Sequence, residues 1–382
     1  CLRRCMMPED AVLLDAEALP RLVSELRERG YTVVGPTVRD GAIMLSELES
    51  AADLPYGWGV ETEAGRYRLR RRDDTAAFAH SAGPQSLKDI LHPPRARLWS
   101  ADLTTGDVAT TGPDEAPRYA VIGARPCDLA AVAVLDRVLS GGAHPEPIYT
   151  ARRDGVFLVA VECTEPGATC FCTSMGGGPD ARDGFDLAMT ELIGERGHRF
   201  VVRAGSPAGA EVLAALPTRP ADGEAVTEAR EAVAGAARAM TRSMPGESLP
   251  GMLAAAREAP HWTDVASRCL TCGNCTMVCP TCFCTTTEDV TDLTGEHAER
   301  WRHWDSCFDL DFSYLHGGSV RVSGESRYRQ WMSHKLGTWH DQFGSSGCVG
   351  CGRCIAWCPA GIDITEEAAA LSAWRRSEEE PC

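Results

Sequence analysis

Two runs of cysteine in the second half of the chain share one spacing, C-x2-C-x2-C-x3-C-P. The first run is Cys269, Cys272, Cys275 and Cys279, and the second run is Cys348, Cys351, Cys354 and Cys358. In runs of this kind three thiolates on one tight loop hold a [4Fe-4S] cluster, and the fourth, beside its proline, binds the other cluster. The spacing therefore predicts cluster 1 on Cys269, Cys272, Cys275 and Cys358, and cluster 2 on Cys348, Cys351, Cys354 and Cys279. A chain with two such clusters is predicted to carry electrons.

Structural zinc and a disulfide framework are the alternative uses of these cysteines. Zinc sites normally use two separated pairs, whereas each run here places four cysteines within eleven residues. A chain of 382 residues can bury an ample core without disulfides. No apolar stretch of the kind found in secretory signals follows the arginines at positions 3 and 4, so the expected compartment is the reducing cytosol.

The charge and apolar patterning exclude two classes of function. A net charge of −16 argues against nucleic-acid binding, which requires a basic surface. No apolar run approaches the roughly 20 residues that span a bilayer, so no membrane segment is expected. The most basic stretch, Arg70 to Arg72, is followed directly by Asp73 and Asp74, and we interpret it as a solvated turn.

The first half of the chain alternates predicted strands and helices. Tyr119 to Gly123 and Val156 to Val161 have the pattern of buried strands, and Asp128 to Leu139 between them reads as an apolar helix. Strand, helix and strand in this order predict a βαβ unit with parallel strands. Further elements are predicted at Leu19 to Arg29 (helix), Tyr31 to Pro36, Ala42 to Leu48 and Tyr67 to Leu69 (strands).

Four cysteines outside the two runs are expected at the edge of this sheet. Cys127 follows the first strand of the βαβ unit, Cys163 follows the second, and Cys170 and Cys172 come shortly after. The carboxyl ends of parallel strands meet at one edge, where open α/β folds bind their ligands. The four thiols are therefore predicted to form a third [4Fe-4S] site, although packing or redox thiols remain the alternative.

The composition predicts two domains and a linker. Residues 1–220 are expected to form an α/β or α+β domain, 221–258 a helical linker rich in Ala, Glu and Arg, and 259–382 the cluster domain. The two cysteine runs are 68 residues apart, and helical spacing of apolar residues within this interval predicts a mainly α-helical ferredoxin-type domain with two [4Fe-4S] motifs. Seven of the nine tryptophans follow position 260 and are interpreted as packing residues that shield the clusters from water.

Three cysteines in the cluster domain remain without an assigned role. Cys282 and Cys284 lie in a near copy of the segment around Cys170 and Cys172, and Cys307 follows downstream. Three thiols are one short of the ligands of a [4Fe-4S] cluster, so a structural role is favoured over a further metal site or thiol exchange. No function is assigned to Cys1, Cys5 or Cys382.

The sequence resembles the β subunit of soluble NAD(P)-linked [NiFe] hydrogenases of the sulfhydrogenase type, and its sister family, the iron–sulfur subunit of anaerobic sulfite reductase. The matching segments are Gly30 to Pro36, Gly123 to Leu129, Cys170 to Gly176, Cys279 to Cys284, Trp304 to Cys307, His334 to Leu336 and Cys348 to Cys354. Paired cluster motifs occur in many ferredoxin-like proteins, so Arg125-Pro126-Cys127-Asp128 and Cys170-Phe171-Cys172 discriminate best.

The resemblance implies a cytoplasmic iron–sulfur subunit that passes electrons between hydrogenase large and small subunits and a flavin- and NAD(P)-binding reductase subunit. The residues agree, because the chain has no dinucleotide fingerprint, no P-loop and no evident acid–base constellation. No complete active site is therefore expected on this chain. The corresponding subunit of anaerobic sulfite reductase and a cluster-containing thiol or disulfide reductase, using Cys282, Cys284 or Cys307, remain the alternatives.

Overall fold

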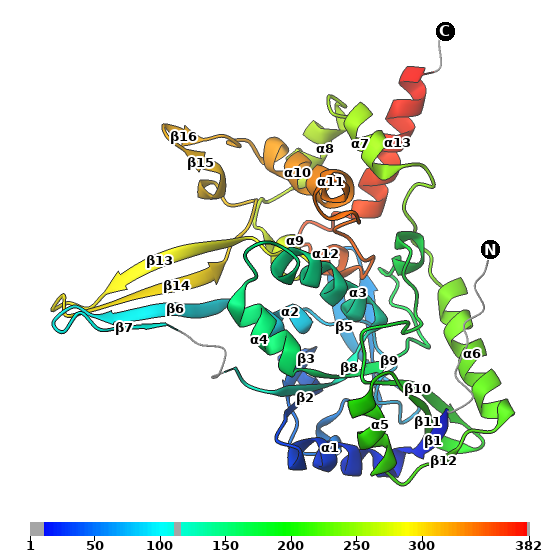
Figure 1. The fold of residues 1–382 in the computed structure, drawn as a ribbon. Helices are drawn as coiled ribbons and strands as arrows, with labels where there is room; N and C mark the ends of the chain where they lie inside the picture. Colours follow the sequence, from blue (N-terminus) through cyan, green and yellow to red (C-terminus); the bar gives the residue numbers. More distant parts are fainter. Residues whose placement is uncertain (1–10, 111–115, 380–382) are drawn as a thin grey trace.

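An eight-stranded mixed sheet forms the base of the molecule in the computed structural model, which describes residues 11–110 and 116–379 (Figure 1). Its strands are β1 (Val12–Asp15), β2 (Thr32–Arg39), β3 (Ala42–Glu47), β8 (Tyr119–Ala124), β9 (Phe157–Val161), β10 (Leu187–Gly194), β11 (Gly197–Ala204) and β12 (Arg219–Pro220). The strand order is β12-β1-β11-β10-β9-β8-β2-β3. Strands β10, β9, β8 and β2 run parallel, and the outer pairs are antiparallel. The predicted parallel pairing of the βαβ strands is thus confirmed.

Helices cover both faces of this sheet. They are α1 (Leu19–Glu28), α2 (Leu87–Leu91), α3 (Pro126–Leu135), α4 (Pro147–Gly155), α5 (Pro207–Ala214) and α6 (Gly223–Arg238). On β9, Phe157 and Val159 belong to the core beneath α1 and α5, whereas Leu158 and Ala160 belong to the core beneath α2, α3 and α4. Alternate side chains of a strand point to opposite faces, which explains why the buried strand is apolar throughout. Helix α6, inside the segment predicted as a linker, packs on β10 and β11 through Ala225 and Ala229.

The cluster domain lies above the sheet in Figure 1. Its helices are α7 (Leu249–Ala255), α8 (His261–Arg268), α9 (Asn274–Met277), α10 (Gly324–Ser333), α11 (Trp339–Phe343), α12 (Arg353–Ala356) and α13 (Ile364–Glu379). One core contains four large, buried aromatic side chains, and cysteines of both runs pack against it. The four are Trp262, Phe308, Tyr328 and Trp331. Large aromatic side chains therefore surround the cysteine runs, in line with their interpretation as packing residues.

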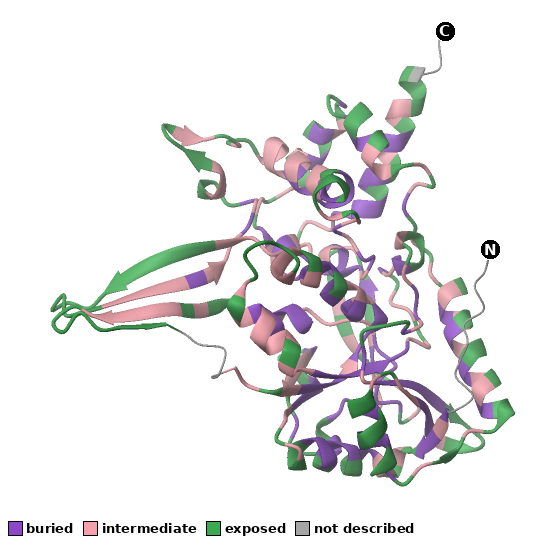
Figure 2. Ribbon diagram, viewed as in Figure 1, coloured by how far each residue is buried: buried purple, intermediate pink, exposed green. Residues whose placement is uncertain are grey.

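A long antiparallel arm projects from the body and joins the two halves of the chain (Figure 1). It consists of β6 (Arg95–Asp102), β7 (Val108–Thr110), β13 (Thr285–Thr291) and β14 (His297–Trp304), in the order β13-β14-β6-β7. Figure 2 shows that most of the arm is exposed or partly exposed. The interval between the cysteine runs is therefore partly β-structure rather than only helical, because the Thr-rich segment of β13 favours a strand.

Two shorter hairpins complete the described chain. β4 (Trp58–Glu63) and β5 (Arg66–Arg71) form one, and β15 (Tyr314–Leu315) and β16 (Gly318–Ser319) form the other. The β4–β5 hairpin reaches the second cysteine run, since the backbone N–H of Gly65 donates to the carbonyl of Ile355 at 3.0 Å. Tyr67 also stacks on Trp357, with ring centroids 5.0 Å apart. The N-terminal half therefore supports the cluster domain directly.

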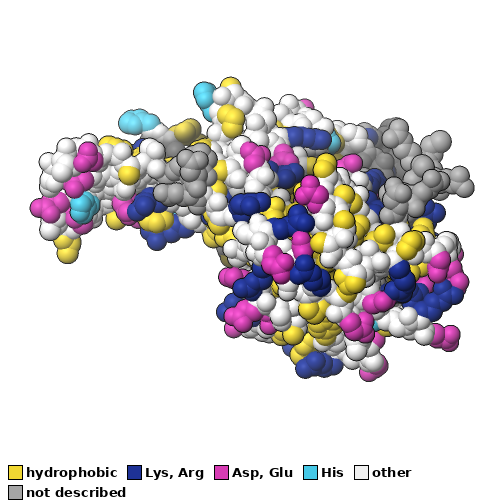
Figure 3. All heavy atoms as spheres, turned by 60° about the horizontal axis from the view of Figure 1, so that its bottom comes forward, with side chains coloured by type: hydrophobic (Ala, Val, Ile, Leu, Met, Phe, Trp, Pro, Cys, Tyr) yellow, Lys and Arg dark blue, Asp and Glu magenta, His cyan; other side chains and the backbone are white. Residues whose placement is uncertain are grey.

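The surface carries both signs of charge. On the face shown in Figure 3, basic and acidic side chains are interspersed rather than gathered into one basic patch. No helix within the described ranges has both the length and the apolar character needed to cross a membrane.

Candidate metal centres

The four cysteines predicted for cluster 1 line a single cavity. Cys269 and Cys272 come from the loop between α8 and α9, Cys275 comes from α9 itself, and Cys358 comes from the end of the second run. The remaining walls are mainly apolar and include Phe308, Tyr328, Trp331, Ile362 and Ile364. The fold thus brings a cysteine of one run to the loop of the other, across a separation of more than 80 residues.

Backbone and side-chain donors fit an anionic group in this cavity. The N–H of Thr271 lies 3.4 Å from the sulfur of Cys269, and the N–H of Ile362 lies 3.4 Å from the sulfur of Cys358. The buried hydroxyl of Tyr328 and indole N–H of Trp331 have no hydrogen-bond partner in the described protein. Unpartnered buried donors are costly unless an acceptor is present, and the sulfides and thiolates of a cluster are acceptors.

The cysteines predicted for cluster 2 also converge. Lys335 joins the two runs, because its ammonium group lies 3.3 Å from the sulfur of Cys279 and donates to the carbonyl of Gly347, next to Cys348, at 3.0 Å. Burial raises the pKa of Cys348 to about 12, against the effect of Lys335, and the thiols of Cys351 and Cys279 add to the rise. Burial likewise raises the pKa of Cys354, with contributions from Cys348, Cys351 and Cys279. The thiol of Cys275 also contributes to the raised pKa of Cys354, so cysteines of the two predicted clusters lie near one another.

Cys127, Cys163, Cys170 and Cys172, which we call the N-terminal quartet, gather beside Cys351. Cys127 lies in the first turn of α3 after β8, and Cys163 follows β9. Burial and the thiols of Cys163 and Cys351 raise the pKa of Cys170 to about 12. Burial, together with Cys170, Cys163 and Cys351, raises the pKa of Cys172. Burial raises the pKa of Cys127, and the nearby thiols of Cys351 and Cys163 add to the rise.

The loop of the second cysteine run packs directly on the quartet segment. The N–H of Phe171 donates to the carbonyl of Gly350 at 2.9 Å. A Cβ atom at Gly350 would lie 2.5 Å from the Cα of Cys172, and one at Gly352 would lie 2.2 Å from the carbonyl oxygen of Thr169. Both glycines also have φ near +70°, a conformation that other residues rarely adopt. Only glycine therefore allows this close approach.

Replacing Gly352 by alanine is expected to destabilise the protein by about 2–5 kcal/mol, because it adds backbone strain and a clash with the backbone at Thr169. Thermal unfolding of the anaerobic protein, followed together with iron content, measures the effect. Gly344→Ala is the matched control, since Gly344 has φ +69° but nothing within 4 Å of its Cβ position. Equal losses of stability in the two variants would mean that the close contact of Gly352 with the quartet segment contributes nothing to stability.

The Arg125-Pro126-Cys127-Asp128 segment fixes the quartet to the second cysteine run. One carboxylate oxygen of Asp128 accepts from the backbone N–H of Arg125 at 3.1 Å, and the other accepts from the guanidinium of Arg353 at 2.8 Å. Arg125 donates to the carbonyls of Phe78 and His80. The Nε of Arg125 and the Nη1 of Arg353 are buried without a partner in the described protein. These two donors fit an anionic group at the quartet, since the nearby thiols include Cys163 and Cys351.

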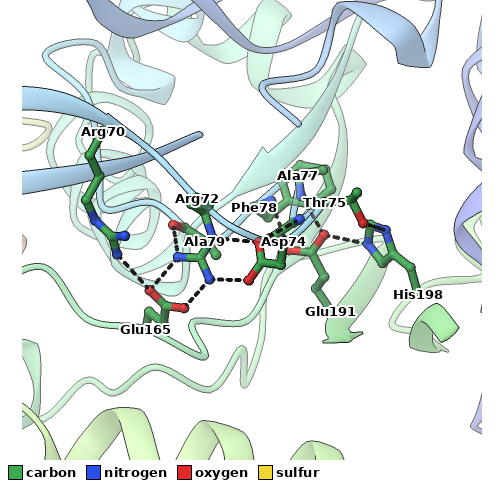
Figure 4. Close-up of polar contacts among 11 residues, drawn as sticks. Arg70, Arg72, Asp74, Thr75, Ala77, Phe78, Ala79, Glu165, Glu191 and His198 are labelled. Atoms are coloured by element: carbon green, nitrogen blue, oxygen red, sulfur yellow. Dashed lines mark hydrogen bonds and ion pairs between the residues drawn. The ribbon is translucent and has the colours of Figure 1, made fainter. Parts of the chain in front are cut away.

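A second layer of polar contacts holds the segment 74–79, which contains Phe78, the residue whose carbonyl accepts from Arg125 (Figure 4). Arg72 is mostly buried and pairs with Asp74 and Glu165, both at 2.7 Å. Glu191 accepts from the backbone N–H groups of Ala77 and Phe78 and lies 2.8 Å from a ring nitrogen of His198. The interpretation of Arg70 to Arg72 as a solvated turn was therefore wrong for Arg72, whereas Arg70 and Arg71 are exposed but belong to strand β5 rather than to a turn. Two carboxylates neutralise the Arg72 guanidinium, which allows its burial, and one of them follows Cys163 by two residues.

Cys282, Cys284 and Cys307 belong to none of the predicted ligand sets, although Cys282 and Cys307 lie near predicted ligands. The thiol of Cys282 lies within hydrogen-bonding distance of Cys279. This contact raises the pKa of Cys282. Cys284 and Cys307 line an open cavity of about 800 Å³ together with Arg321 and His334. Burial and the neighbouring Cys284 thiol raise the pKa of Cys307 to about 12. In the ranges 11–110 and 116–379, no group of three or more His, Cys, Asp or Glu side chains is closed around the position of a single metal ion.

Sequence reasoning missed three charged residues at these centres. Lys335 contacts Cys279 of the first run and the carbonyl of Gly347 just before the second run. Arg353 lies within the second run and donates to Asp128. Lys88 approaches the first run through the carbonyls of Thr276 and Met277. Isolated basic residues form no motif. The one available signal was composition, because Lys88 and Lys335 are the only lysines in the sequence.

Comparison with known proteins identifies the class of the site. Residues 268–362 match the family described as a 4Fe-4S dicluster domain. The cluster domain is therefore a [4Fe-4S] electron-transfer module.

The chain is 34% identical over 249 residues to sulfhydrogenase 2 subunit beta of Pyrococcus furiosus, an alignment that covers 64% of this chain and 72% of the relative. The chain belongs to the family of this sulfhydrogenase β subunit, as the sequence resemblance predicted. No solved structure matches the chain.

Proposed function

We propose that this chain relays electrons between a [NiFe] hydrogenase module and a flavin- and NAD(P)-binding reductase subunit in the cytoplasm. The observation that carries the proposal is the contact between the three cysteine groups. Cys354 of the second run lines the cavity of the cluster 1 cysteines, and the Cys170 thiol lies 3.9 Å from the carbonyl oxygen of Cys351. Each [4Fe-4S] cluster, when bound, takes and gives up one electron. The protein supplies the spacing, the apolar shielding and the charges that tune these transfers.

Cluster 1 is proposed to be held by Cys269, Cys272, Cys275 and Cys358, and cluster 2 by Cys348, Cys351, Cys354 and Cys279. Support comes from the shared cavity of the first set and from the contacts of Lys335 in the second. Cys272 is exposed, whereas the cysteines of the second set are partly buried. Cluster 1 is therefore the proposed port for exchange with another protein of the complex, since such a partner can approach it most closely.

A third [4Fe-4S] cluster is proposed on Cys127, Cys163, Cys170 and Cys172. The unpartnered donors of Arg125 and Arg353 support an anionic group at this place. Anaerobically purified protein is expected to contain about twelve iron atoms per chain, and a Cys127→Ser, Cys163→Ser double variant about eight. Iron analysis with Mössbauer spectroscopy measures both values. Retention of the full wild-type complement by the double variant would remove the third cluster from the proposal.

The nickel and siroheme contents of the complex that co-purifies with this chain test the assignment of partners. Nickel without siroheme is expected for a hydrogenase complex. Siroheme without nickel would instead support the iron–sulfur subunit of an anaerobic sulfite reductase, which would use the same ligands.

A second candidate function is a thiol or disulfide reductase. It is favoured by one observation, the placement of Cys284 and Cys307 on an open cavity beside the cluster domain. A Cys284→Ser, Cys307→Ser variant discriminates the two functions. The relay predicts that electron transfer through the complex persists in this variant, whereas a thiol enzyme would lose its activity with all clusters intact.

A further inference from the structure

The chain contains only two lysines among its 38 Lys and Arg residues, and both are buried beside the same cysteines. Lys88 belongs to α2 of the sheet domain, and Lys335 lies in the short π-helix His334–Thr338 that follows α10. They are 247 positions apart in sequence, and their side chains are 2% and 3% exposed. Lysine is normally a surface residue, so its confinement to one buried place calls for a specific role.

Lys335 makes three polar contacts around Cys279. Its ammonium group lies 3.3 Å from the Cys279 sulfur, 3.2 Å from the Thr281 hydroxyl and 3.0 Å from the carbonyl oxygen of Gly347. An ammonium group has three donors, and these contacts use all of them. The thiol groups of Cys279, Cys282 and Cys348 outweigh the effect of burial and hold the Lys335 pKa above its usual value.

Lys88 approaches the same cysteines from the sheet domain. Its ammonium group is 3.4 Å from the carbonyl oxygen of Thr276 and 3.2 Å from that of Met277, and it lies 3.7 Å from the ring centre of Trp304. Burial lowers the pKa of Lys88, whereas the thiol groups of Cys282 and Cys279 oppose this effect. Lys88 is therefore a second basic side chain near Cys279.

None of these direct contacts is with a carboxylate, and the one carboxylate that acts on Lys88 is the neighbouring Asp89, which makes no hydrogen bond to it. A buried ammonium group without an opposite charge is strongly unfavourable. A [4Fe-4S] cluster on four thiolates is anionic and becomes more negative on reduction, so it would balance the lysines better when reduced. The lining of the cluster 1 cavity holds no charged side chain, since it consists of cysteine, glycine, proline, aliphatic and aromatic residues, and the positive charge of Arg327 acts on Cys269 from outside this lining.

From this contrast we infer that Lys335, assisted by Lys88, raises the reduction potential of cluster 2 above that of cluster 1. Cluster 2 would then be the cluster that holds the electron between transfers. The inference depends on the proposed ligands of cluster 2. Lysine suits this task better than arginine, because its charge is a compact point that can sit against a single sulfur.

Redox titration of the anaerobic full-length protein, monitored by electron paramagnetic resonance, tests the inference. The cluster 2 signal is identified as the one lost in a Cys351→Ser variant. In Lys335→Met, the midpoint potential of cluster 2 is expected to fall by at least ~59 mV, a tenfold change in the one-electron equilibrium. Iron content and the midpoint of cluster 1 are expected to stay unchanged. Lys88→Met, which removes no contact with sulfur, is expected to shift the cluster 2 midpoint in the same direction by less.

The matched control is Arg219→Met, which removes one exposed positive charge at the far edge of the sheet and is expected to shift neither midpoint. An unchanged cluster 2 midpoint in Lys335→Met with full iron content would overturn the inference. Loss of iron in both lysine variants would also overturn the inference, since the lysines would then be needed for cluster assembly rather than for setting the reduction potential. Absence of a cluster 2 signal from the wild-type protein would instead refute the proposed ligands.

Discussion

Replacing Cys358 by serine is expected to remove cluster 1, although Cys358 lies in the second cysteine run. The reason is spatial, because Cys358 lines the same cavity as Cys269, Cys272 and Cys275. The variant should lose about four iron atoms per chain and the signal of cluster 1, while the signal of cluster 2 persists. Iron analysis and electron paramagnetic resonance of the reduced, anaerobic protein measure both quantities.

The reciprocal variant and a control complete this experiment. Cys279→Ser should remove cluster 2 and spare cluster 1, since Cys279 lies with Lys335 and the loop before Cys348. Cys284→Ser should keep the full iron content, because Cys284 lines the open cavity instead. Loss of the cluster 2 signal in Cys358→Ser would show that each run binds its own cluster, and the crossed arrangement would be abandoned.

Local patterns in the sequence predicted the elements whose partners are close along the chain. The parallel pair β8 and β9 was predicted because two apolar runs flank one apolar helix, and the fold of that unit is set by nearby residues. The arm was missed because β6 pairs with β14, which lies almost 200 residues further on. A pairing of that separation leaves no mark on the local periodicity of either strand.

The same distinction applies to the candidate centres. Cysteine spacing is a repeated motif, so the eight motif cysteines could be located from the sequence. Lys88, Lys335 and Arg353 belong to no motif. Most of their contacts are with groups more than 50 positions away in the sequence. Arg72 was misinterpreted for the same reason, because Glu165 neutralises it from a distant part of the chain.

Replacing Arg353 by methionine is expected to cost about 3–5 kcal/mol, because it leaves Asp128 as a buried carboxylate without its partner. Both members of this pair are almost fully buried, at 2% and 8% side-chain exposure. Arg353 also donates to the carbonyls of Gly83 and Gln85, so its loss leaves two further, partly buried acceptors without this donor. The variant should show a lower thermal midpoint. It should also lose iron from the N-terminal quartet first, since Asp128 is the neighbour of Cys127.

An Arg353→Met, Asp128→Leu double variant separates the ion pair from the rest of the effect. Removing both charges avoids the unpaired carboxylate, so the double variant is expected to be less destabilised than the sum of the single variants. Arg66→Met is the surface control, because its pair with Glu63 is exposed and should change stability by less than about 1 kcal/mol. Strict additivity of the two buried substitutions would mean that the Arg353–Asp128 contact does not couple the quartet to the second cysteine run. The close packing of Gly350 and Gly352 on the quartet segment would then be the main physical link between the two halves of the relay.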